Sequence, residues 1–266
     1  MNRAAAPSLQ AMSDGTFVAR PSYFGAEPTV RPEVFDRDGT ARLPIGCFLI
    51  RTAEQVVLVD AGLGPRRKQM PDGMELHGGQ LLTELTALGT ARHEITDVVC
   101  THLHSDHVGW LFDSDAQPTF PGARIWFGAA DWDYFVDGPG ELDVEVEAGF
   151  RRPQNSSLLR PLDRETELAP GVTTLMTPGH TPGHLCLMVD FGDRRSLLLG
   201  DAITHPVQLA EPTWHSFGDV DANLADRSRQ QLWHALEDPL VTGTGAHFPG
   251  LRFGGVRVGA GRTWSS

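Results

Sequence analysis

The sequence has few cysteines and lacks any long apolar run. Its three cysteines, Cys47, Cys100 and Cys186, each stand in a short apolar stretch, and their odd number and wide spacing do not favour a disulfide framework or a cysteine metal site. We therefore expect reduced cysteines buried in the core. No apolar run approaches the roughly 20 residues that a membrane-spanning helix needs, and the first residues show no apolar signal segment. These observations predict a cytoplasmic protein without a membrane partner.

Positive charge is also scarce. Lys and Arg number 22 against 34 Asp and Glu, which gives a net charge of −12, and no basic stripe is present. Nucleic acid is therefore not an expected partner, since binding to phosphates needs clustered basic side chains. We expect a small-molecule substrate instead, and a homodimer stays open.

The chain length allows a large core. With 266 residues, 40% of them hydrophobic, the protein can bury enough apolar surface to fold without disulfides or a structural metal. A metal would therefore serve chemistry more than folding.

The pattern along the chain predicts α/β layers around one core. Residues 1–40, rich in prolines, read as an N-terminal arm with at most one strand, around TFVAR, and residues 41–266 as the main domain. The polar, proline-interrupted stretch 137–170 reads as a long loop with some helix that can cover a pocket. The clearest expected elements are a hairpin over 45–62, strands over 95–102, 123–128 and 239–247, and helices over 79–89 and 222–238.

Four side chains that can bind metal are crowded into THLHSDHVGW, residues 101–110: His102, His104, Asp106 and His107. In extended backbone, residues two apart project to the same side, so His102 and His104 can share one cation. Asp106 and His107 lie past a bend and can serve a second, neighbouring cation. Imidazole and carboxylate ligands suit zinc, with iron or manganese as alternatives. A turn with solvated histidines is the simpler alternative, but three histidines and an aspartate after an apolar strand speak against it.

The stretch HLHSDH resembles the HxHxDH motif of the metallo-β-lactamase superfamily. Three further motifs follow in that family's order: TPGHTPGH at 177–184, LLLGD at 197–201 and VTGTGAH at 241–247. The resemblance covers roughly residues 40–250, and it implies a four-layer αββα sandwich.

Carried onto this sequence, the resemblance implies two divalent metal ions, zinc first and manganese or iron as alternatives. One ion would be held by His102, His104 and His180, the other by Asp106, His107 and His247, with Asp201 bridging them. It also implies a metal-bridging hydroxide as nucleophile, with Asp106 as the catalytic residue that orients it and helps protonate the leaving group. We expect His184 to brace its loop by hydrogen bonding and Asp60 to lie behind the ligands.

Three further residues are candidates for substrate binding because they lie close to the motifs: Thr204, His205 and Trp110. Loop and packing roles stay open for all three. Asp131 reads as a solvated residue at a helix start. The stretch EPTWHSFGD, residues 211–219, can reach the pocket.

The motifs are most similar to the branch that holds quorum-quenching lactonases and methyl parathion hydrolase-like enzymes. This similarity implies hydrolysis of a lactone or other carboxylic ester; a phosphotriester, a thioester or a β-lactam is the alternative substrate. One departure is Thr204, because many lactonases of this branch carry a tyrosine there. An iron-dependent oxidoreductase, similar to persulfide dioxygenases, and a binding module without activity are the alternatives from other classes.

Overall fold

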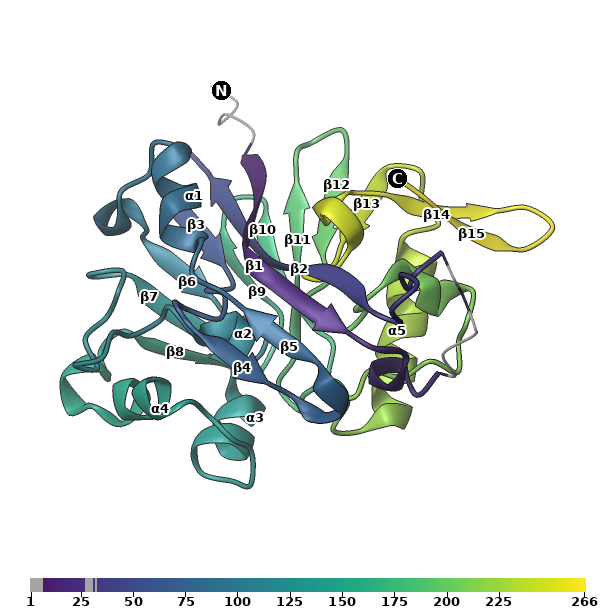
Figure 1. Cartoon of the computed structure of the whole chain (residues 1–266). Coiled ribbons are helices and arrows are strands. Elements are labelled where there is room, and N and C mark those ends of the chain that lie inside the picture. The colour runs from purple at the N-terminus through teal and green to yellow at the C-terminus, as the bar shows by residue number, and fades with distance from the viewer. Residues whose placement is uncertain (1–6, 27–30, 32) are drawn as a thin grey trace.

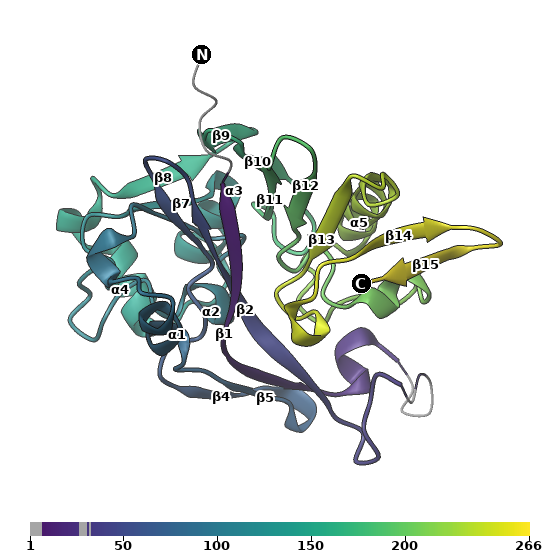
Figure 2. The same ribbon diagram turned by 90° about the horizontal axis from the view of Figure 1, so that it is seen from above.

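The computed structural model describes residues 7–26, 31 and 33–266, and two β-sheets form its centre (Figures 1 and 2). Within these residues the larger sheet has eight strands, in the order β4-β5-β1-β2-β3-β6-β7-β8, and the smaller has five, in the order β13-β12-β11-β10-β9. The strands are β1 Ser8–Ala19, β2 Ala41–Arg51, β3 Val56–Val59, β4 Arg67–Gln69, β5 Glu75–His77, β6 Asp97–Val99, β7 Arg124–Gly128, β8 Leu159–Leu162, β9 Thr166–Ala169, β10 Val172–Met176, β11 Leu185–Asp190, β12 Arg195–Leu198, β13 Val241–Thr244, β14 Gly255–Val258 and β15 Arg262–Ser265.

Helices cover the outer faces of both sheets. Figure 2 shows α1 and α4 outside the larger sheet and α5 beyond the smaller one, while Figure 1 shows the hairpin β14–β15 projecting from the body. The α-helices are α1 Leu81–Ala87, α2 Ser105–Val108, α3 Ala129–Asp131, α4 Val144–Arg151 and α5 Ala222–Ala235. The short helical turns are η1 Pro21–Phe24, η2 Pro71–Gly73, η3 Arg92–Glu94, η4 Trp132–Val136, η5 Pro153–Asn155, η6 Pro206–Leu209 and η7 Pro249–Leu251.

Apolar side chains point alternately to the two faces of each strand, and this alternation produces the layers. On β2, Phe48 and Ile50 pack between the two sheets, whereas Cys47 and Leu49 face the core under α1. The outer face of the smaller sheet packs against Trp233 and its neighbours on α5. Because successive side chains of a strand point to opposite faces, each sheet is apolar on both sides. The four-layer αββα sandwich expected from the resemblance is confirmed.

The predicted hairpin, helices and central strands are all present, but two stretches differ from expectation. The strand expected around TFVAR begins earlier, at Ser8, and β1 lies between β5 and β2 inside the larger sheet. Residues before 41 therefore help to build the main sheet, in place of a separate arm. Two of the prolines of this stretch, Pro28 and Pro32, lie outside the described residues. The stretch 137–170 is less of a loop than expected, since it contains α4, β8 and β9. Pro161 fits in β8 because that strand is at the sheet edge, where a missing N–H is tolerated.

Two further expectations concern the whole described chain. All three cysteines are buried and free, as predicted. Among the described helices, none combines the length and the apolar character required to cross a bilayer.

The parallel strand pairs determine where the motifs meet. β3 pairs with β6, and β12 pairs with β13, each in parallel register. Carboxyl ends of parallel strands share one edge of a sheet, so the segments that follow these four strands are brought together. The motif residues follow β6, β12 and β13, or lie between β10 and β11.

Candidate metal centre

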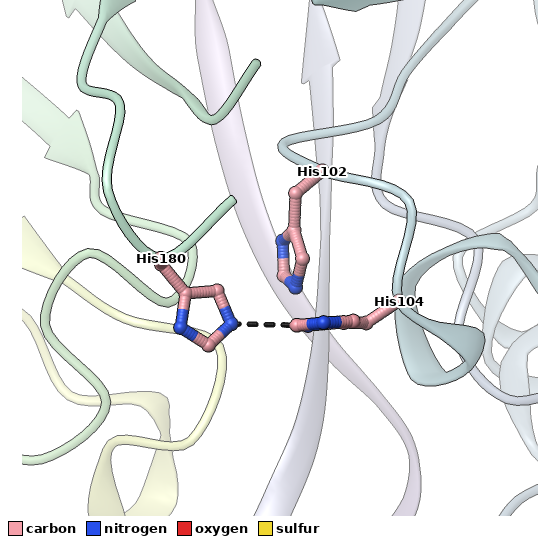
Figure 3. Close-up of side chains that lie close together, drawn as sticks. All are labelled: His102, His104 and His180. Atoms are coloured by element: carbon pink, nitrogen blue, oxygen red, sulfur yellow. Dashed lines mark hydrogen bonds between the residues drawn. The ribbon is translucent and has the colours of Figure 1, made fainter. Parts of the chain in front are cut away.

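Seven side chains converge where these strands end. They form three groups, and within each group the possible ligand atoms lie within 4.8 Å of one another. These groups are His102, His104 and His180; His102, His107 and Asp201; and Asp106, His107 and His247. In Figure 3 the rings of the first group turn toward a common point, and the dashed line joins His104 and His180, whose Nδ1 and Nε2 lie 3.1 Å apart. The residues predicted as ligands are thus brought together, and the first and third groups are the two expected ones, while the second joins His102 and His107 with Asp201. That they bind metal stays a prediction.

Asp201 lies between the two outer groups. Its carboxylate oxygens are 3.7 Å from Nε2 of His180, 3.7 Å from Nε2 of His107 and 3.3 Å from Nε2 of His247. One carboxylate therefore faces imidazoles of both groups. This is the position that a bridging ligand needs, and it agrees with the position implied by the motif.

Several buried polar atoms of the cluster have no hydrogen-bond partner within the described chain. They are Nε2 of His102, Nε2 of His107 and Oδ1 of Asp201. A buried polar atom without a partner costs free energy, so a native structure normally gives it one. Imidazole nitrogens and a carboxylate oxygen at this separation are the donor set that zinc and related cations prefer. The residues present therefore fit metal ions.

Hydrogen bonds behind the rings fix their orientation. The Nδ1 atoms of His107, His180 and His247 lie 2.7–2.9 Å from an oxygen. These oxygens belong to Asp60 for His107, Asp219 for His180 and the Pro44 carbonyl for His247. An imidazole that donates from Nδ1 presents a neutral, lone-pair-bearing Nε2 to the centre, which is what a metal ligand requires.

The charges in the cluster favour a cation. Burial, together with the neighbouring imidazoles, holds the pKa of His102 and His104 well below the ordinary value, so these rings stay neutral. At His107, burial acts in the same direction, but the carboxylates of Asp60 and Asp106 outweigh it and raise the pKa to about 10. The carboxylates that stabilise a proton on the His107 ring supply negative charge that would equally stabilise a divalent ion in the place of that proton.

His184 has the bracing role that we expected. Its Nδ1 lies 2.8 Å from the Thr177 hydroxyl, and its Nε2 accepts a hydrogen bond from the backbone N–H of Asp201 at 3.1 Å. Burial is the main cause that lowers the pKa of His184 to about 3, which keeps Nε2 free to accept. His184 thus couples the TPGHTPGH turn to the Asp201 loop. In this turn, Gly179 has φ +136°, and a Cβ there would lie 2.1 Å from the backbone N of Ala225 on α5.

The three candidates for substrate binding do not line the cavity described below. The Thr204 hydroxyl is 2.6 Å from the Ser216 hydroxyl, and the indole N–H of Trp110 donates to buried Asp14 at 2.8 Å. His205 accepts from the Val207 N–H at the start of η6 and lines a different hollow, beside Phe248 and Trp264. A contact of these residues with substrate stays a prediction.

The prediction for Asp131 is wrong. Its carboxylate is fully buried and accepts hydrogen bonds from the Leu103 N–H, the Thr181 hydroxyl and the Gly183 N–H at 2.7–3.2 Å. One side chain therefore ties the loop of His102 and His104 to the turn of His180. The sequence gives no local sign of this role, because the partners lie 28 to 52 residues away.

The segment 214–220 covers one side of the cluster, as EPTWHSFGD suggested. Asp219 binds His180 and also accepts from the Ser216 N–H and from the guanidinium of buried Arg229. Gly218 packs against the cluster so closely that a Cβ would lie 2.9 Å from Cε1 of His180 and 3.1 Å from Cε1 of His104. The sequence reasoning did not single out Asp219 or Arg229.

A cavity of about 610 Å³ opens above the cluster. Its floor contains Asp106, Asp201 and three of the histidines, and most of its walls are apolar or aromatic. The apolar and aromatic residues of the wall come from separate segments, and Lys68, Gln69 and Glu141 add polar groups to it. The apolar and aromatic residues are Phe17, Tyr23, Met70, Pro71, Leu76, Tyr134, Phe135, Pro139, Phe217 and Val220. The N-terminal residues and the start of the 137–170 stretch thus reach the cavity, where substrate selection was expected.

Comparison with protein families matches residues 41–243 to the metallo-β-lactamase superfamily. This chain belongs to that superfamily. The expected family is therefore confirmed, and all but the last of the metal-binding candidates lie inside the matched range.

Curated relatives of this superfamily member include several N-acyl homoserine lactonases. The lactonase AiiB of Agrobacterium fabrum is 29% identical over 208 residues, which cover 70% of this chain and 71% of that protein. An N-acyl homoserine lactonase of Bacillus cereus is 24% identical over 219 residues, 75% of this chain and 80% of its own length. These names agree with the lactonase branch expected from the motifs.

Solved structures with the same fold cover nearly the whole chain. AidC, a dizinc quorum-quenching lactonase in complex with the product N-hexanoyl-L-homoserine, has a TM-score of 0.85 and 22% identity over 99% of this chain and 95% of its own. The hydrolase AbOPH has a TM-score of 0.81 and 21% identity over 99% and 94%. At these identities the likeness establishes the fold.

Proposed function

We propose that the protein is a metal-dependent hydrolase that opens a lactone, with N-acyl homoserine lactones as the substrate class. The observation that carries this proposal is the cluster of unpartnered imidazole and carboxylate atoms at the floor of a cavity with aromatic and apolar wall residues. The lactonases among the relatives support the choice of a lactone over other esters.

Two divalent ions, zinc in the first place, would be held by His102, His104 and His180 and by Asp106, His107 and His247, with Asp201 between them. When bound, such ions act as Lewis acids and lower the pKa of water toward neutrality. Hydrolysis also moves a proton from the attacking water to the leaving alkoxide. Asp106 is suited to that transfer, because its carboxylate lies at the cavity floor, 3.4 Å from Nε2 of His247.

The walls of the cavity suit an acyl chain. Phe17, Met70 and Phe217 offer apolar surface to the same cavity that the carboxylates of Asp106 and Asp201 line. A substrate with an ester at one end and an apolar chain at the other would place each part against matching groups.

Metal content measured together with turnover tests the proposal. Protein stripped with a chelator should not hydrolyse N-hexanoyl homoserine lactone, and zinc or manganese should restore ring opening at two ions per chain. A phosphotriester, a thioester and a β-lactam, assayed in parallel, should be poorer substrates by kcat/KM. Preference for one of these, a single iron with persulfide oxidation, or two bound ions without any turnover would each contradict the proposal.

We infer that the protein works in the cytoplasm. The three buried, free cysteines support a reducing compartment. Its net charge of −12 supports a small molecule over nucleic acid as partner. The homodimer stays a prediction that light scattering during gel filtration would test.

A further inference from the structure

Tyr23 places a phenol beside the candidate metal centre from a segment that carries no motif. It belongs to the turn η1 (Pro21–Phe24), is 5% exposed, and lines the same cavity as Asp106 and Asp201. Together with Phe17, Tyr23 forms the part of the cavity wall that the N-terminal residues contribute.

The ring of Tyr23 is held firmly. Phe17 and Phe24 both pack against it edge-on, with ring centroids 4.9 Å away. Its backbone carbonyl accepts a hydrogen bond from the Phe217 N–H at 2.8 Å, which ties the turn to the segment that covers the cluster. A phenol fixed in this way needs little reordering when a ligand binds.

A chain of hydroxyl groups begins at Tyr23. Its side-chain partner is Thr204, and Thr204 in turn bonds the Ser216 hydroxyl at 2.6 Å. A phenol ordinarily carries its proton at neutral pH, and burial raises the pKa of Tyr23 further. If Ser216 donates to Thr204 and Thr204 donates to Tyr23, the phenol proton is left to donate into the cavity.

We infer that the Tyr23 hydroxyl donates a hydrogen bond to the carbonyl oxygen of the bond being hydrolysed. This inference rests on the proposed function and adds a catalytic residue to it. Negative charge grows on that oxygen as water adds to the carbonyl carbon, so a donor already in place stabilises the transition state more than the bound substrate. The phenol keeps its proton throughout, and no covalent step passes through it.

The Tyr23→Phe variant tests this role, because it removes only the hydroxyl. We expect kcat for N-hexanoyl homoserine lactone to fall roughly 100- to 1,000-fold, with metal content and melting temperature unchanged. Binding of a γ-lactam analogue, which keeps the carbonyl but resists hydrolysis, should weaken about fivefold by calorimetry. The chain's other tyrosine provides the comparison: Tyr134→Phe also removes a phenol hydroxyl, and its loss of kcat should be at least about fivefold smaller.

A purely structural role predicts a different pattern. Equal losses in both variants, or a lower melting temperature with unchanged lactam binding, would overturn the inference. If Tyr23→Phe does not fold, Thr204→Val removes the partner of the phenol and should lower kcat by a smaller factor; an unchanged kcat would overturn the inference. A metal-loaded wild type that does not open lactones overturns the proposed function as well, whereas full turnover by Tyr23→Phe overturns this inference alone.

Discussion

The metal-candidate cluster and the wall of the cavity above it are built in opposite ways. The cluster is polar and almost fully buried, and the rings of His107, His180 and His247 each have an oxygen behind them. The wall is largely apolar and partly exposed; Phe217, for example, is 55% exposed. Rigid positioning serves chemistry, whereas an open apolar surface serves contact with variable chains. Changes in the cluster should therefore act on catalysis and metal binding, and changes in the wall on substrate choice.

The largest effect is expected at Asp201, which faces both outer groups of the cluster. Asp201→Asn should lower kcat/KM about 10³-fold or more, because a shared site of this kind contributes several kcal/mol to the transition state. Metal analysis should find fewer than two ions per chain, while circular dichroism stays that of the wild type. The exposed turn residue Asp193 is the matched control, since Asp193→Asn should change neither quantity. Full activity with one bound ion would contradict the role of Asp201.

The cluster could be predicted from sequence because its ligands stand in short motifs. Four of them, His102, His104, Asp106 and His107, lie within six residues, and the others lie in short motifs near strand ends. The groups behind the ligands could not be predicted in this way. Asp131 and Asp219 act on histidines that are distant in sequence, and a lone aspartate in a polar stretch looks the same whether it is solvated or buried.

A smaller effect is expected at Asp219, directly behind the cluster. Asp219→Asn keeps the shape but removes the charge that faces His180 and buried Arg229, so we expect a 10- to 100-fold loss of metal affinity or activity. Competition with a chromogenic chelator measures the affinity. Asp226 is the control, since it also pairs with Arg229, at 2.7 Å, but is 39% exposed and, among the described residues, forms no ion pair with a histidine of the cluster. Equal losses in Asp226→Asn would mean that the effect passes through Arg229.

The Asp131→Asn variant should affect activity less than the two preceding variants, and its main effect should be on the free energy of unfolding. Burial raises the pKa of Asp131 to about 6, above the ordinary 3.8, so the folded state binds this proton more tightly than the unfolded state. The wild type should therefore lose stability relative to Asp131→Asn as pH rises from about 4 to about 6, by up to about 3 kcal/mol, and the difference should stay constant at higher pH. Urea unfolding of both chelated proteins between pH 4 and 8 measures it. If the difference in free energy of unfolding between the two proteins does not vary with pH, the pKa of Asp131 is not raised.

For the cavity wall, the sequence allowed us to predict the contributing stretches of chain but not the individual side chains. The N-terminal residues and the start of the 137–170 stretch were expected to shape the pocket, and Phe17, Tyr23 and Pro139 do line it. Which side chains reach the cavity depends on how β1 and η1 pack against the segment 214–220, through contacts such as the stacking of Phe24 on Trp214 at 5.5 Å. Such contacts join distant segments and leave no spacing pattern to recognise.

The smallest effect is expected at the rim of the wall. Phe217 is 55% exposed, so an acyl chain that covers it would bury roughly half of its side chain, worth about 1 kcal/mol or a fivefold change in affinity. Phe217→Ala should raise KM about fivefold for a decanoyl homoserine lactone and leave KM for a butanoyl one, which is too short to reach the rim, nearly unchanged. Val144, 79% exposed and outside the cavity, is the control. A fall in kcat for both chain lengths would instead place Phe217 with the cluster, because its N–H is bonded to Tyr23 and its neighbour Gly218 packs on His180.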